Sequence, residues 1–269
     1  MIECLVNGEI GAYVSTTDRG LAYGDGLFET IAVHRGQPRW WQDHMDRMAT
    51  GCERLDLVMP HQAVLLREVQ TACAGHARCV VKIILTRGQG ARGYAPGDNA
   101  DSTRVVSAHD WPGGIEQAWH TGVHAITCNL RLGVQLQLGG IKHLNRLEQV
   151  LAAAEVAQST AGEGILLDAE NHVISAVSAN LFLVSGEQLL TPRLDRCGVR
   201  GILRGRILKA FKQRCELRRI SPDMLAEADE VFTCSAIRGI VPVRSVDELQ
   251  FPIGPVTREL QAWLEGDGA

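Results

Sequence analysis

"GGIKHLNRLEQVL", residues 139–151, places a lysine between a pair of glycines and a leucine-rich run. The chain has 27 basic residues, but only Lys82, Lys142, Lys209 and Lys212 are lysines. Lys209 and Lys212 fall late on a predicted helix, where solvation and the helix dipole explain them. Lys82 lies inside a predicted strand and suits either a surface position or a pocket.

The surroundings of Lys142 favour a role in a binding site. The preceding glycines, Gly139 and Gly140, allow the backbone to approach a ligand closely. Leu144, Leu147, Leu151 and Ala154 recur at helical spacing, which predicts a helix headed by Lys142. Arg146, one turn later, would favour a neutral amine, the form that Schiff-base chemistry requires. On composition and spacing alone, however, an ordinary surface lysine is the favoured interpretation.

The length and composition of the chain limit the classes of protein it can be. With 269 residues there is room for two unequal lobes, and 45% hydrophobic and 22% charged residues exclude a disordered chain. We expect an N-terminal α+β lobe over residues 1–113, a linker over 114–120 that follows the loose stretch Trp111-Pro112-Gly113, and a C-terminal lobe over 121–269 carrying Lys142.

The net charge, the hydrophobic pattern and the cysteines indicate which classes of partner, location and site to expect. A net charge of -4 with scattered arginines argues against nucleic acid as a partner. No run of eighteen apolar residues occurs and the N-terminus lacks signal-peptide features, so we expect a cytoplasmic protein without a membrane segment. The eight cysteines form no Cys-x-x-Cys pair, which predicts reduced thiols and no metal site.

Several elements can be located from local patterns. Asn7-Gly8 between apolar residues predicts a hairpin, apolar spacing predicts a helix over 42–57, and the β-branched run 79–86 predicts a buried strand. Residues 164–192 read as a meander of strands with turns near 169–171 and 185–187. Strands in runs with few helices indicate the α+β class.

Two glycine-rich motifs could hold an anion. Gly88–Gly93 matches G-x-G-x-x-G, but a helix-breaking stretch follows it, which excludes a dinucleotide fold and indicates a loop carrying Arg87 and Arg92. Gly198 and Gly201 precede a predicted helix, so the backbone N–H groups of Ile202 and Leu203 could face an anion. Helices with N-terminal glycines are common without ligands, and for this motif taken by itself the ligand-free interpretation is favoured.

The motifs "DRGLAYGDGLFET", "HMDRM", "LTRGQGARGY", "GIKHLNRLEQVL", "SANLF", "RCGVRGILR" and "GIVPV" together resemble 4-amino-4-deoxychorismate lyases. These enzymes lie within the fold-type IV family of pyridoxal 5'-phosphate enzymes, which also contains D-amino-acid and branched-chain aminotransferases. The resemblance runs from about residue 5 to about residue 245. It implies a two-lobed fold with a small N-terminal and a larger C-terminal lobe, and a homodimer.

The same resemblance implies roles for individual residues. Lys142 would form the internal aldimine and move protons, and Thr30 would assist the release of pyruvate. Tyr23, Arg92 and, in reserve, Arg87 would bind the substrate together with Thr30. The cofactor phosphate would be held by a set of residues comprising Arg47, Ile202, Leu203, Ser235 and Ala236.

The sequence departs from the family pattern at Ser175. Family members usually carry a glutamate five residues before the asparagine of "NLF", where it pairs with the pyridine nitrogen of the cofactor. A serine hydroxyl can only share a hydrogen bond, which should harm an aminotransferase more than a lyase, because aromatisation of the product adds driving force to the lyase. The resemblance therefore implies conversion of 4-amino-4-deoxychorismate to 4-aminobenzoate and pyruvate, in folate synthesis. An aminotransferase for D-amino or branched-chain substrates is the alternative.

Overall fold

The computed structural model describes residues 3–97 and 101–267, and the chain divides into two compact units. The first comprises Met1–Pro112 with Ile141–Asn145, and the second Gly113–Gly140 with Arg146–Ala269. Of the stretch 114–120, expected to be a linker, residues 115–120 lie in helix α4 (Ile115–Thr121) and Gly114 is its N-cap residue. Lys142, expected in the C-terminal lobe, instead belongs to the first unit, because the segment around it pairs with a strand edge there.

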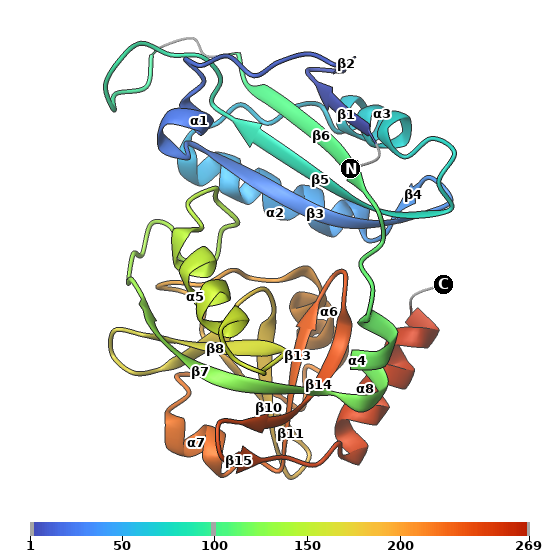
Figure 1. Ribbon diagram of the computed structural model, residues 1–269, viewed down its shortest axis with the longest axis vertical. Helices are drawn as coiled ribbons and strands as arrows, with labels where there is room; N and C mark the ends of the chain where they lie inside the picture. Colours follow the sequence, from blue (N-terminus) through green and yellow to red (C-terminus); the bar gives the residue numbers. More distant parts are fainter. Residues whose placement is uncertain (1–2, 98–100, 268–269) are drawn as a thin grey trace. The chain divides into compact units, whose positions relative to one another are not determined.

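The first unit is an antiparallel six-stranded sheet with two long helices. Its elements are β1 (Glu3–Val6), β2 (Glu9–Ile10), α1 (Arg19–Tyr23), β3 (Gly26–His34), β4 (Gln37–Pro38), α2 (Trp41–Leu55), α3 (Gln62–Ala72), β5 (Arg78–Thr86) and β6 (Thr103–His109). The strand order is β2-β1-β6-β5-β3-β4 (Figure 1). The predicted hairpin, the helix near 42–57 and the strand near 79–86 are confirmed.

The two faces of β3 have different environments. Leu27 faces α2, where Gly51 permits close packing because an added Cβ would lie 2.7 Å from Leu27. Glu29, two residues later, contacts α2 side chains on the same face. Phe28 and Thr30 alternate onto the opposite face and are half-buried. A row of polar side chains can therefore occupy this second face without entering the core.

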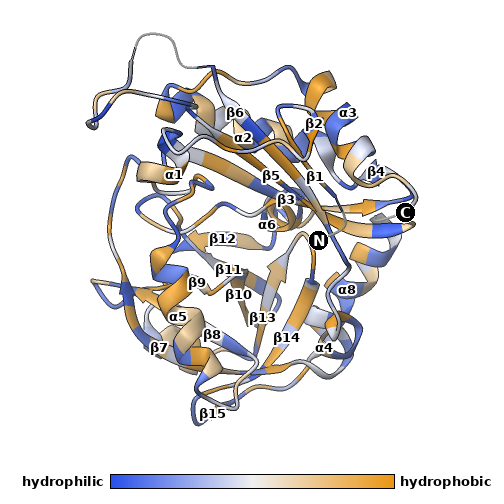
Figure 2. Cartoon of the chain, turned by 45° about the horizontal axis from the view of Figure 1, so that its top comes forward, coloured by the Kyte–Doolittle hydropathy of each residue, from blue (hydrophilic) through white to orange (hydrophobic). Residues whose placement is uncertain are grey.

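The second unit is built on a nine-stranded mixed sheet. Its elements are α4, β7 (Val123–Leu132), α5 (Leu147–Ala157), β8 (Glu163–Asp168), β9 (Val173–Ala176), β10 (Asn180–Ser185), β11 (Gln188–Pro192), α6 (Ile202–Ala210), β12 (Cys215–Arg218), α7 (Pro222–Ala226), β13 (Glu230–Ser235), β14 (Gly239–Val246), β15 (Leu249–Gln250) and α8 (Pro255–Asp267). The order is β12-β11-β10-β13-β14-β7-β8-β9, with β15 beside β14. Most of β14 is apolar (Figure 2), and apolar side chains of β13 and β14 share one core cluster with those of β7–β11. The meander expected over 164–192 is confirmed, and the whole chain has the expected α+β class.

Two helices of this unit differ from expectation. α5 begins at Leu147, so Lys142 does not head it. The stripe predicted on α5 is solvent-facing, with Leu147 76% and Leu151 57% exposed, whereas Ala152 is buried. On α6, Ala210, which was expected to be buried, is exposed, whereas Arg204 is buried.

Hydrogen bonds from the backbone hold the last helix of the second unit, α8. The Glu230 carboxylate accepts hydrogen bonds from the N–H groups of Val256 and Thr257 and caps α8, which lies beside α4 (Figure 1).

All eight cysteines are free thiols, and burial raises the pKa of Cys197 and Cys234 to about 12. Among the described residues no helix is long and apolar enough to cross a bilayer.

Candidate functional site

The backbone around Lys142 extends the sheet of the first unit. β4 pairs with β3 only at Val33 and His34, which leaves the N-terminal half of that edge open. Residues 141–145 fill the edge: Phe28 donates its N–H to the Lys142 carbonyl at 3.0 Å and Leu144 donates to the Gly26 carbonyl at 2.9 Å. An open strand edge requires such partners. The position of Lys142 is therefore set by sheet pairing.

The side chain of Lys142 lies on the half-buried face of the sheet. Its Nζ is 4.1 Å from the centre of the Phe28 ring, a cation–π distance. Lys82 Nζ is 5.2 Å from the same centre, so the two amines lie no farther apart than the sum of these distances. Thr30 is the direct cross-strand partner of Lys82. The predicted catalytic pair, Lys142 and Thr30, thus shares one face with a second lysine.

Lys82 is a residue for which the sequence left two interpretations open. The period of two in strands would have placed Lys82 and Ile84 on one face. Which face carries Thr30, however, depends on the β3–β5 register, in which Thr30 pairs with Lys82. That register joins residues far apart in the chain, so no local pattern revealed it.

Arg47 is held by a buried carboxylate. Its Nε donates to Glu29 Oε1 at 2.8 Å and its Nη2 contacts Oε2, while His44 Nδ1 lies 2.6 Å from Oε2. Burial by itself would raise the pKa of Glu29, but attraction to Arg47 and the hydrogen bond from His44 outweigh it and lower the pKa to about 2. Glu29 stays ionised and orients the guanidinium proposed to hold phosphate.

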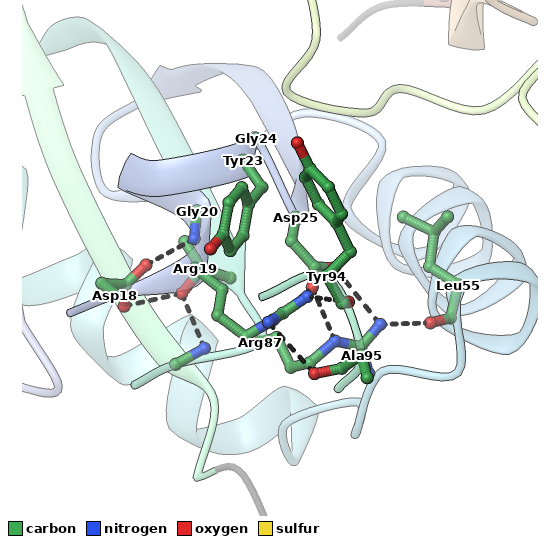
Figure 3. A network of polar contacts seen from close by, with 12 residues as sticks. Asp18, Arg19, Gly20, Tyr23, Gly24, Asp25, Leu55, Arg87, Tyr94 and Ala95 are labelled. Carbon is green, nitrogen blue, oxygen red and sulfur yellow. Dashed lines mark hydrogen bonds and ion pairs between the residues drawn. The ribbon is translucent and has the colours of Figure 1, made fainter. Parts of the chain in front are cut away.

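The loop with Arg87 and Arg92 contains a polar network (Figure 3). Arg87 donates from Nε and Nη2 to the Asp25 carboxylate, and from Nη2 and Nη1 to the carbonyls of Leu55 and Asp56 at the end of α2. Its donors are engaged by protein, which makes it a structural residue and leaves Arg92, exposed on the loop, as the candidate for a substrate carboxylate. Tyr23 supports the same loop, since its hydroxyl accepts the Gly93 N–H at 3.3 Å.

The second unit carries the other predicted residues around the start of α6. Gly201 precedes the helix in extended conformation, and its N–H donates to Asn180 Oδ1 at 2.9 Å. An added Cβ would lie 2.0 Å from that oxygen, so any side chain at this position would displace Asn180. No side chain among the described residues caps this helix, which suits an anion at the N–H groups of Ile202 and Leu203.

Sheet register brings further predicted residues to Asn180. Asn180 is the cross-strand partner of Cys234, the residue before Ser235 and Ala236. The Ala176 N–H donates to the Ala179 carbonyl at 2.9 Å, so a tight turn joins β9, which carries Ser175, to the start of β10 at Asn180. The residues of this unit that were predicted to bind phosphate, and the Ser175 position, thus lie around Asn180, which the sequence analysis used only as part of a motif.

Arg204 on α6 is buried but has a different role. It donates to Thr191 Oγ1 at 3.1 Å and to the Pro192 carbonyl at 2.9 Å, and burial lowers its pKa to about 10. These bonds fix α6 against β11. Within residues 3–97 and 101–267, no group of three or more His, Cys, Asp or Glu is placed to hold a metal ion.

Comparison with known proteins places these observations in a family context. The model of the amino-transferase class IV family matches residues 26–246. A protein of Vibrio harveyi named aminodeoxychorismate lyase is 35% identical, over 96% of this chain and 98% of its own length. The crystal structure of 4-amino-4-deoxychorismate lyase from Pseudomonas aeruginosa superimposes with a TM-score of 0.93 at 44% identity, over 98% of both chains. D-alanine aminotransferase of Listeria monocytogenes is 28% identical over 98% of this chain and 95% of its own.

Proposed function

Because the chain belongs to the class IV amino-transferase family, we propose that it is a pyridoxal phosphate-dependent lyase, converting 4-amino-4-deoxychorismate to 4-aminobenzoate and pyruvate. The observation that carries the proposal is the placement of Lys142, the lysine of "GIKHLNRLEQVL". Backbone hydrogen bonds hold its segment at the β3 edge, and its side chain lies beside Phe28 on the face that carries Thr30. Near full-length similarity to two lyases supports the choice of reaction.

The residues present fit pyridoxal phosphate. Lys142 offers the amine for a covalent bond to the cofactor aldehyde. Arg47, oriented by Glu29, and the uncapped N–H groups of Ile202 and Leu203 offer donors for a phosphate, the combination that phosphate sites in proteins commonly use. Ser235 and Ala236, at the end of β13, would complete the phosphate contacts. When bound, the cofactor supplies an electron sink for the carbon next to the substrate nitrogen.

The chain's own groups then handle protons and charge. Lys142 Nζ takes the proton from the ring carbon that bears the substrate amine. Thr30 Oγ1, or Lys142 after that step, supplies a proton to the methylene carbon of the departing enolpyruvyl group, which leaves as pyruvate while the ring becomes aromatic. Arg92, with Tyr23 supporting its loop, binds a substrate carboxylate.

Ser175 is the feature that bears on the rival reaction. It is buried on β9, 8% exposed, where family members usually carry a glutamate. A hydroxyl cannot hold the pyridine nitrogen protonated as a carboxylate does. The aminotransferase alternative depends more strongly on that proton, so Ser175 favours the lyase.

The decisive experiment is a coupled assay. The purified protein is incubated with chorismate, glutamine and an aminodeoxychorismate synthase, and 4-aminobenzoate is measured by chromatography. We expect product with the wild type and none with Lys142→Ala, and borohydride reduction followed by peptide mapping should label Lys142. Conversion of the cofactor to its amine form by D-alanine or leucine alone, without 4-aminobenzoate in the coupled assay, would replace the lyase by the aminotransferase.

Two further expectations stay predictions. The family resemblance implies a homodimer, which sedimentation equilibrium of the purified chain will test. The cytoplasmic location expected from the sequence can be tested by fractionation of cells that produce the protein.

A further inference from the structure

The loop that follows β5 has little internal structure. Residues 91–97 are all exposed and form neither helix nor strand. At its base, the Arg19 N–H donates to the Gly88 carbonyl at 2.8 Å and the Gly90 N–H to the Thr17 carbonyl at 3.1 Å. Beyond that base, the loop backbone is held within the described residues by two side chains of α1, those of Arg19 and Tyr23.

The Arg19 side chain donates hydrogen bonds to three successive backbone carbonyls of the loop (Figure 3). Its Nη1 donates to the carbonyls of Gly93 at 3.0 Å and Ala95 at 3.4 Å, and its Nη2 donates to that of Tyr94 at 2.7 Å. Arg19 is only 4% exposed, although the loop above it is open to solvent. Gly90 makes room for it, since an added Cβ would lie 2.8 Å from Arg19 Cδ.

The guanidinium is itself anchored to the rigid part of the unit. Arg19 Nε donates to Asp25 Oδ2 at 2.9 Å, and Arg87 Nε donates to the same oxygen at 2.8 Å. Burial of Asp25 acts to raise its pKa, but the hydrogen bonds from Arg87 and Arg19 outweigh it and lower the pKa. Arg87 in turn binds the last carbonyls of α2. A continuous chain of charge-assisted bonds thus connects α2 to the loop.

We propose that Arg19 is a positioning residue for the substrate: by fixing the carbonyls of residues 93–95, it holds Arg92 in the conformation that binds a substrate carboxylate. This inference rests on the proposed function, because Arg92 needs a carboxylate ligand. The planar fork of arginine is essential, because a lysine ammonium at this position can pair with Asp25 but cannot span three carbonyls.

The test combines proteolysis with kinetics in the cofactor-loaded protein. Arg19→Met and Arg19→Lys are compared with Arg104→Met. This control removes another arginine–carboxylate pair of the first unit, that of Arg104 on β6 with Glu68 on α3, which includes no residue of 91–97. Native trypsin cleavage after Arg92 is followed by mass spectrometry, with cleavage after Lys212, an exposed site of the second unit, as internal reference. Both Arg19 variants should accelerate the Arg92 cut about tenfold relative to the reference, and Arg104→Met should not.

Kinetics then decide whether the held loop serves the substrate. Arg19→Met should raise KM for the aminodeoxychorismate about tenfold and change kcat by less than about twofold, and Arg19→Lys, which also cannot hold the three carbonyls, should have a similar effect. In an Arg92→Ala background, Arg19→Met should add no further rise in KM, because both substitutions remove the same contact, that between Arg92 and the substrate carboxylate.

The outcomes separate this inference from the proposed function. Unchanged cleavage in both Arg19 variants overturns the loop contact, even if the wild type has no lyase activity. Faster cleavage with unchanged KM, or KM effects that add in the double variant, overturns the positioning role while leaving the lyase intact. If Arg19→Met does not fold, Arg19→Lys, which keeps the charge beside Asp25, decides the same points.

Discussion

Replacing Glu29 by glutamine removes the buried charge that orients Arg47. The glutamine keeps the size of the side chain but cannot pair with the guanidinium or accept the His44 hydrogen bond as a carboxylate does. Glu29 is 1% exposed, so solvent does not screen its interactions. We therefore expect Glu29→Gln to destabilise the first unit and to loosen Arg47.

The magnitude follows from the pKa of Glu29. Folding lowers it from 4.5 to about 2, and each unit corresponds to about 1.4 kcal/mol, so the ionised carboxylate contributes about 3 kcal/mol to the free energy of unfolding. Because the folded-state pKa is the lower one, this contribution is fully present above the unfolded pKa near 4.5. It is lost as the pH falls through the range down to about 2.

The assay is urea unfolding of wild type and Glu29→Gln, followed by circular dichroism at several pH values between 7 and 3. The difference in unfolding free energy between the two proteins should be about 3 kcal/mol at pH 7 and should shrink as the pH falls below 4.5. Titration of other carboxylates cancels in this difference. Glu170→Gln is the control: Glu170 pairs with Arg196 but is 48% exposed in its side chain, so its loss should be much smaller. A Glu29→Gln difference that stays constant from pH 7 to pH 3 would refute the assigned charge coupling.

Three other substitutions test separate parts of the site. Gly201→Ala forces a Cβ against Asn180, so cofactor affinity measured by fluorescence titration should fall about tenfold, at a stability cost of about 1–3 kcal/mol. Lys82→Met removes a cation opposite Thr30, and we expect KM for the substrate to rise about fivefold with kcat nearly unchanged; the opposite split would assign Lys82 to the chemical step. Ser175→Glu should shift the absorption spectrum of the bound cofactor through protonation of its ring nitrogen and raise any amino-transfer rate; an unchanged spectrum and unchanged rates would count against the role of this position.

Local patterns were sufficient for much of the fold. Asn7 and Gly8 both have positive φ, 52° and 88°, which is what an Asn-Gly hairpin requires. The apolar spacing in α2 and the β-branched run in β5 each reflect a regular structure formed within one segment. The start of α6 was also readable, because the glycine before it and the apolar residues after it are neighbours in sequence.

The site depended on contacts between distant segments. The spacing around Lys142 suggested a helix start, but an unpaired edge of β3 bound this segment instead, and no residue near position 142 encodes that partner. Arg87 was kept as a reserve for Arg92 in the sequence analysis, and only the structure shows that Asp25 and Leu55 accept the hydrogen bonds of Arg87.

The sequence by itself therefore determined many of the elements, the class of the fold and, through its motifs, the lysine and the family. Tertiary structure alone decided which side chains face that lysine and which arginines are engaged by the protein. The physical reason is range: turns and amphipathic faces arise from neighbouring residues, whereas sheet register and the acceptor of a guanidinium are chosen only when segments far apart in the chain come together.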